Sequence, residues 1–122
     1  MYYIRQAALE LILGASRSLH PREFIGFLRA EGNTITEVLV TPGMTYGEGF
    51  SSSSEYMLPL DRSIIGSVHS HPSAVNLPSQ GDLVVFGRKG SVHLIAGYPY
   101  QSIKDIAAYD RQGRRAELET AP

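Results

Sequence analysis

Apolar residues recur at helical spacing near the start of the chain and in short, strand-like runs after it. Between residues 4 and 19 they fall every three or four positions, with charged residues between them, which predicts an amphipathic helix over Ile4–Leu19. His20-Pro21 ends that helix, because the residue before a proline is disfavoured in the helical region. Two apolar runs, Phe24–Ala30 and Thr34–Val40, flank a short turn and predict a β-hairpin.

The rest of the chain predicts further strands and one short helix. The glycine- and serine-rich stretch 41–54 predicts a loop, and a strand is expected over 54–60. Ile64–His71 predicts a strand and Ser79–Phe86 a short helix. Three closing strands are predicted over Val92–Gly97, Ile103–Asp110 and Arg114–Glu119. The pattern predicts one α+β domain over 1–122, in which a long N-terminal helix and a short second helix pack on a mixed, mostly antiparallel and largely sequential sheet.

Composition narrows the class of protein. A length of 122 residues allows one packed core and not two. Eleven basic and twelve acidic residues give a net charge of −1, which argues against nucleic acid as the main partner. The absence of cysteine excludes disulfides, thiolate zinc clusters and cysteine nucleophiles. No signal-peptide pattern and no apolar run near the roughly 20 residues of a membrane span are present, so a cytoplasmic location without membrane contact is predicted.

The run from His69 to His71 carries the most distinctive chemistry. Alternate residues of a strand lie on one face about 6.5–7 Å apart, so His69 and His71 can approach the same ion while Ser70 points the other way. Asp82, from the following helix, can add a carboxylate oxygen. Two imidazole nitrogens and one carboxylate predict a catalytic zinc site that keeps one position open to water.

Ser79 and Asp82 also have a structural interpretation. Ser-x-x-Asp at the start of a helix is typical of a capping box, in which Ser79 accepts an amide hydrogen bond and Asp82 favours the positive end of the helix. The two roles partly compete for the same atoms. The metal interpretation is preferred because two histidines at ligand spacing precede this pair in the sequence.

The other histidines and the Tyr98-Pro99-Tyr100 run favour structural roles. His20 lies at the end of the first helix, where a cation interacts favourably with the helix dipole. His93 lies within an apolar strand, where a buried and hydrogen-bonded histidine is expected. The two tyrosines are expected to pack at the end of a strand.

The chain resembles the JAMM (MPN+, JAB domain) zinc metalloproteases in their minimal archaeal or bacterial form. Their motif has an upstream glutamate, then His-Ser/Thr-His-Pro, then a serine and an aspartate at fixed spacing. The matching positions here are Glu23, residues 69–72, Ser79 and Asp82. Only residues 83–91 separate Asp82 from the next predicted strand, so the second insertion of the eukaryotic members has no counterpart.

The resemblance implies a cytidine-deaminase-like MPN fold and a role for each motif residue. His69, His71 and Asp82 would hold Zn²⁺. Glu23 would carry a proton from water to the departing amine, and Ser79 would donate its hydroxyl to the oxyanion.

The resemblance also implies a substrate class. The expected reaction is hydrolysis of the amide bond after the C-terminal glycine of a ubiquitin-like or sulfur-carrier protein, and residues 41–54 could order against the substrate tail by strand addition. The alternative is a non-catalytic MPN-fold scaffold that binds partners; such members typically lose ligands, and this chain keeps them all. A DNA-associated relative is disfavoured by the charge balance and by the lack of room for a further helical region. The sequence does not indicate the oligomeric state.

Overall fold

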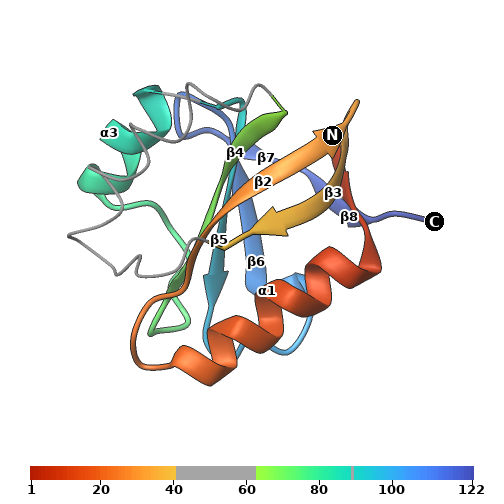
Figure 1. Cartoon of the computed structure of the whole chain (residues 1–122). Helices are drawn as coiled ribbons and strands as arrows, with labels where there is room; N and C mark the ends of the chain where they lie inside the picture. Colours follow the sequence, from red (N-terminus) through yellow and green to blue (C-terminus); the bar gives the residue numbers. More distant parts are fainter. Residues whose placement is uncertain (41–62, 89) are drawn as a thin grey trace.

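A computed structural model describes residues 1–40, 63–88 and 90–122, and its strands form one curved sheet with a helix on either side (Figure 1). The elements in chain order are β1 (Tyr2–Ile4), α1 (Gln6–Leu19), β2 (Ile25–Glu31), β3 (Thr34–Leu39), β4 (Ile64–His71), α3 (Gln80–Arg88), β5 (Val92–Gly97), η2 (Ile103–Asp105), β6 (Ile106–Tyr109), β7 (Arg115–Ala116) and β8 (Leu118–Thr120). The predicted loop over 41–54 and strand over 54–60 lie outside the described residues.

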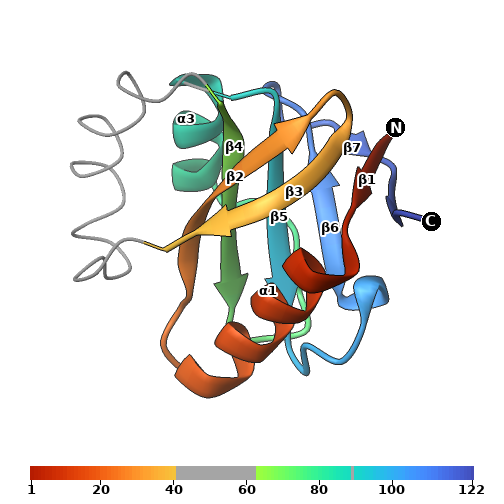
Figure 2. The ribbon, with the colours of Figure 1, turned by 45° about the vertical axis from the view of Figure 1, so that its right-hand side comes forward.

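The predicted mixed α+β architecture is confirmed, and its sheet has the strand order β7-β6-β5-β4-β2-β3-β1-β8. Four of these pairings are antiparallel and three are parallel. The expectation of a largely sequential sheet is wrong in the middle and at one end. There β4 pairs with β2 instead of β3, and the first and last strands lie side by side (Figure 2).

Two predicted strands, β4 and β5, begin and end where expected, whereas other boundaries differ. The first helix begins at Gln6 and not at Ile4, because Ile4 pairs with both β3 and β8 as part of a short strand. The predicted strand over 103–110 opens with a 3-10 turn, which the Ser102 hydroxyl caps by accepting from the Lys104 amide. The predicted strand over 114–119 is two short strands, which pair with opposite ends of the sheet.

The strands β5 and β6 are buried on both faces of the sheet, and their alternate residues divide between the two sides. Val92, Leu94 and Ala96 belong to the larger core beneath α1. Ile95 packs instead with Phe86 of α3, in a smaller core on the opposite face. Because each strand contributes to both cores, α1 and α3 sit on opposite sides of the sheet.

The β4, α3 and β5 elements form a crossover unit at the centre of the fold. β4 and β5 run parallel, and parallel neighbours need a crossover connection, which here contains α3. The other edge of β4 pairs antiparallel with β2. The carboxyl end of β4 therefore lies next to the start of β2 and close to the start of α3. None of the helices in the described part of the chain is both long and apolar enough to cross a membrane.

Gly66 is predicted to be irreplaceable because β5 approaches it closely. A Cβ at this position would lie 1.6 Å from the Val92 carbonyl oxygen, a backbone atom that a side-chain rotation cannot move. We expect Gly66→Ala to lower the free energy of unfolding by about 3 kcal/mol, the upper end of the usual cost of overpacking. The measurement is denaturant-induced unfolding.

The matched control is Gly14→Ala in α1, where a Cβ meets nothing within 4 Å. That change should stabilise the protein by about 0.5–1 kcal/mol, because alanine loses less conformational entropy in a helix. Equal unfolding midpoints for Gly66→Ala and the unmodified chain would contradict the packing argument.

Candidate metal centre

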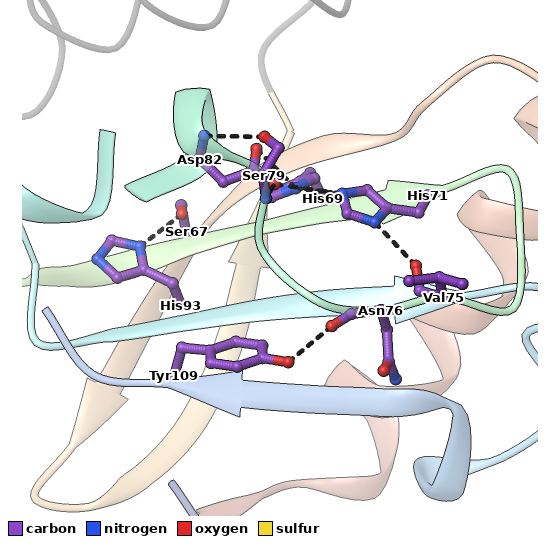
Figure 3. Close-up of polar contacts among 9 residues, drawn as sticks. All are labelled: Ser67, His69, His71, Val75, Asn76, Ser79, Asp82, His93 and Tyr109. Atoms are coloured by element: carbon purple, nitrogen blue, oxygen red, sulfur yellow. Dashed lines mark hydrogen bonds and ion pairs between the residues drawn. The ribbon is translucent and has the colours of Figure 1, made fainter. Parts of the chain in front are cut away.

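His69 and His71 project from the same face of β4 and meet at their ring tips. Their Nε2 atoms lie 3.2 Å apart, as expected for residues two apart on a strand (Figure 3). His69 is only 3% exposed, and β4 is paired at this position with both Ile25 and Ile95. His71 is the last residue of the strand and is partly exposed.

Asp82 reaches the two histidines from the first turn of α3. Its Oδ1 lies 3.2 Å from His69 Nε2, and its Oδ2 lies 3.3 Å from His71 Nε2. The capping box is also formed, because the Ser79 amide donates to Asp82 Oδ2 at 2.8 Å and the Asp82 amide donates to the Ser79 hydroxyl at 3.1 Å. The structural interpretation and the approach to the histidines are therefore compatible, and the box holds the carboxylate in place.

The three side chains fit a zinc ion. Tetrahedral zinc with bonds of about 2.0–2.1 Å places its ligand atoms about 3.3–3.4 Å apart. The two Nε2 atoms lie 3.2 Å apart, close to that spacing, and each faces its own oxygen of the Asp82 carboxylate, His69 the Oδ1 atom at 3.2 Å and His71 the Oδ2 atom at 3.3 Å. Burial opposes ionisation of Asp82, but hydrogen bonds from His69 and His71 outweigh it and hold its carboxyl pKa well below the ordinary value. An anionic carboxylate beside two imidazoles is a donor set that suits zinc.

Glu23 lies next to the histidines, just before β2. Ligand atoms of Glu23, His69 and His71 all lie within 4.8 Å of one another. Glu23 Oε1 is buried and has no hydrogen-bond partner among the described residues. Burial raises the pKa of Glu23, which the nearby histidines lower and Asp82 raises further. A carboxyl group with a raised pKa is suited to exchanging protons.

Ser70 connects β4 to the main chain next to Glu23. It lies between the two histidines and therefore points to the opposite face of β4. Its hydroxyl accepts a 2.7 Å hydrogen bond from the Phe24 amide, and its own amide donates to the Phe24 carbonyl at 2.9 Å. Phe24 directly follows Glu23, so this pair of bonds ties the glutamate's main chain to the strand that carries the histidines.

The loop between His71 and α3 orients the His71 ring. The Val75 carbonyl lies 3.0 Å from His71 Nδ1, which places the ring proton on Nδ1 and leaves Nε2 free to bind a cation (Figure 3). The next residue, Asn76, anchors this loop: its carbonyl accepts from the Tyr109 hydroxyl at 2.8 Å, and its side chain donates to the Asp105 carbonyl at 3.2 Å.

Phe86 packs α3 against the sheet, on the same helix that brings Asp82 to the histidines. The two residues are four apart, so they share the inner face of the helix. Phe86 is fully buried and stacks on the His93 ring, with centroids 4.2 Å apart and planes inclined by 7°. His93 lies 2.7 Å from the Ser67 hydroxyl through Nδ1 and is 1% exposed, as expected for a structural histidine.

Tyr100 and His20, to which the sequence pattern assigned packing and helix-end roles, are linked to the main chain of His71. The Tyr100 hydroxyl donates to the His71 carbonyl at 2.8 Å, and His20 Nδ1 lies 3.0 Å from that hydroxyl. They are 80 residues apart in the chain, and no spacing rule connects them. Only their meeting in the folded chain reveals the contact.

Comparison with known proteins agrees with this geometry. The sequence profile described as prokaryotic homologs of the JAB domain matches residues 5–112. A protein of Haloferax volcanii named a probable metalloprotease is 37% identical over 122 residues, covering 92% of this chain and 74% of that protein.

Solved structures of JAB1/MPN and JAMM proteins have the same fold as this chain. A JAB1/MPN domain protein from Archaeoglobus fulgidus superimposes with a TM-score of 0.77 at 33% identity, over 100% of this chain and 98% of that one. A structure described as JAMM, a metalloprotease-like zinc site in the proteasome and signalosome, gives a TM-score of 0.77 at 32% identity, over 100% and 99%. The chain therefore belongs to the prokaryotic JAB-domain family of JAMM-type, metalloprotease-like proteins.

Proposed function

We propose that this chain is a zinc-dependent isopeptidase or peptidase that hydrolyses the amide bond after the C-terminal glycine of a ubiquitin-like or sulfur-carrier protein. The observation that carries the proposal is the convergence of His69, His71 and Asp82 beside the partly buried carboxyl group of Glu23. The substrate class is supported by the motif resemblance to JAMM proteases.

His69, His71 and Asp82 would hold the ion and leave one side of it to solvent and substrate. Zinc bound there supplies Lewis-acid chemistry, which polarises a carbonyl group and lowers the pKa of water. The contribution of the protein is to fix the donor atoms before the ion arrives. The capping box fixes Asp82, the Val75 carbonyl fixes the ring of His71, and strand pairing fixes His69.

Glu23 would move the proton. Water attacks the carbonyl carbon, the carbon–nitrogen bond breaks, and the proton that water loses reaches the amine nitrogen through the Glu23 carboxyl group. A carboxyl whose pKa is raised by burial can both accept that proton and return it, which an ordinary exposed glutamate does less well.

Ser79 would stabilise the oxyanion that forms during attack. Its oxygen accepts from the Asp82 amide, so its single hydroxyl hydrogen remains available to donate.

A partner-binding scaffold is the alternative function. A scaffold gains nothing from a carboxyl oxygen that is buried without a hydrogen-bond partner among the described residues, because such burial costs folding free energy. The burial of Glu23 beside the histidines therefore favours a catalytic site.

Zinc binding should depend on Asp82. The unmodified chain should hold one zinc ion, measured by elemental analysis. Asp82→Asn should weaken zinc binding by more than the roughly 10–100-fold typical of losing a residue that only supports a ligand. Asp110→Asn, the same change on a distant turn, should leave zinc binding intact, as measured by chelator competition. A purified chain without stoichiometric zinc would refute the proposed centre.

Glu23→Gln should abolish turnover while zinc stays bound. Loss of a general acid–base typically costs about 10²–10⁴ in rate. The raised pKa means that folding disfavours the Glu23 carboxylate, so the zinc-free variant should be more stable than the zinc-free parent at neutral pH. That advantage should shrink as the pH falls through the raised pKa, because Glu23 itself then becomes neutral.

Thermal unfolding of chelated protein across pH gives the stability comparison, and hydrolysis assays give the rate. Glu10→Gln, on the exposed side of α1, is the control and should change neither. Normal cleavage by Glu23→Gln would show that Glu23 is not the proton carrier.

Substrate class is tested with ubiquitin-like and sulfur-carrier proteins joined through their C-terminal glycine to a reporter amine. The zinc-loaded chain should release a free glycine carboxylate from at least one of them, detected by intact-mass measurement, and chelation should stop the release. If zinc-loaded protein cleaves none of them but cleaves unrelated peptides, the protease chemistry stands and the substrate class is wrong.

A further inference from the structure

Tyr100 has a backbone conformation that a tyrosine rarely adopts. Its φ is +57°, in the left-handed region, and it is the one described residue other than glycine with a positive φ. The side chain is 1% exposed and is among the largest that are fully buried. Such a conformation persists only where surrounding contacts hold it, and it often occurs close to functional sites.

The Tyr100 hydroxyl joins α1 to the strand that carries the histidines. It has one hydrogen, which it donates to the His71 carbonyl at 2.8 Å. His20 Nδ1, 3.0 Å from the same hydroxyl, must then be the donor of the second hydrogen bond. The polar chain therefore runs in one direction, from His20 through Tyr100 to His71.

The end of α1 also holds the rest of Tyr100. The Arg17 guanidinium donates to the Tyr100 carbonyl. The His20 ring lies 5.6 Å from the Tyr100 ring and 4.8 Å from the Tyr98 ring, measured between centroids. Contacts with the main chain, the ring and the hydroxyl together fix the position of this phenol.

His71 is the histidine that needs this support. His69 is paired with both neighbouring strands, whereas His71 pairs only with Gly97 of β5, because β2 begins opposite His69. A residue at the end of a strand is freer to shift. The Val75 carbonyl holds the His71 ring, and Tyr100 holds its main chain.

We propose that Tyr100 is a positioning residue for the metal centre. Its phenol, oriented by His20, fixes the main chain of His71 so that Nε2 stays at ligand distance from the other two donors. This inference rests on the proposed zinc site and adds residues from α1 and from the turn after β5 to it.

The test is Tyr100→Phe, which removes the hydroxyl and keeps the ring. We expect its zinc affinity, measured by chelator competition, to fall about tenfold or more, the range typical of losing a group that supports a ligand. The visible spectrum of the cobalt-substituted protein should also change, because it reports the geometry around the ion. Tyr98→Phe alters an exposed neighbour in the same cluster and should affect neither measurement.

His20 supplies a second set of variants in case Tyr100→Phe does not fold. Asparagine can place an N–H donor close to the position of histidine Nδ1, whereas leucine cannot donate. His20→Leu should weaken zinc binding, and His20→Asn should retain most of it. If Tyr100→Phe does fold, adding His20→Leu to it should cause no further loss of affinity, because the hydroxyl through which His20 acts is gone.

The outcomes separate this inference from the proposed function. If the unmodified chain binds zinc and Tyr100→Phe binds it with equal affinity and an unchanged cobalt spectrum, the positioning role is wrong and the zinc site stands. Loss of thermal stability without loss of zinc affinity would mean that the phenol is only structural and would equally overturn the inference. If the unmodified chain binds no zinc, both proposals fall.

Discussion

The position of β4 between two other strands is the constraint on which the site depends. A strand paired on both sides cannot slip or rotate without breaking two ladders of hydrogen bonds, so its side chains have fixed directions. The period of two then sends His69 and His71 to one face and Ser70 to the other. Ser70 binds Phe24, which brings Glu23 to the same edge of the sheet. One short strand thus places both the histidines and the carboxyl group beside them.

At the start of α3, the charge of Asp82 opposes the helix dipole. The positive end of a helix dipole, equivalent to roughly half a charge, is an unfavourable neighbour for a cation. Asp82 offsets it with a full negative charge, because hydrogen bonds keep its pKa low and its carboxyl ionised. The capping box satisfies an amide at the helix start with Oδ2, and Oδ1 lies against His69. The carboxylate therefore caps the helix and completes the donor set at the same time.

The sequence pattern predicted those features that depend on residues close together in the chain. The bounds of β4 and β5 and the meeting of His69 with His71 follow from strand periodicity. The pairing of β2 with β4 and the short strand at the N-terminus depend on partners far along the chain, and no local spacing encodes them. The same holds for Tyr100, whose contact with His71 spans 29 residues. The capping box and the metal motif both use Ser79 and Asp82. From the sequence alone the two roles competed, whereas in the fold they are compatible.

The arrangement also links ion binding to packing. The donor atoms come from two elements, the sheet and α3, and they meet only while Phe86 keeps α3 docked on the smaller core. If His69 and Asp82 hold an ion, as proposed, the free energy of binding it would also favour docking of that helix. Tyr100 extends the link to the opposite face, because its hydroxyl connects His71 to His20 at the end of α1. The proposed metal centre thus depends on contacts in three layers of the fold, and a substitution in any of them would be expected to change ion affinity even where it alters no proposed ligand.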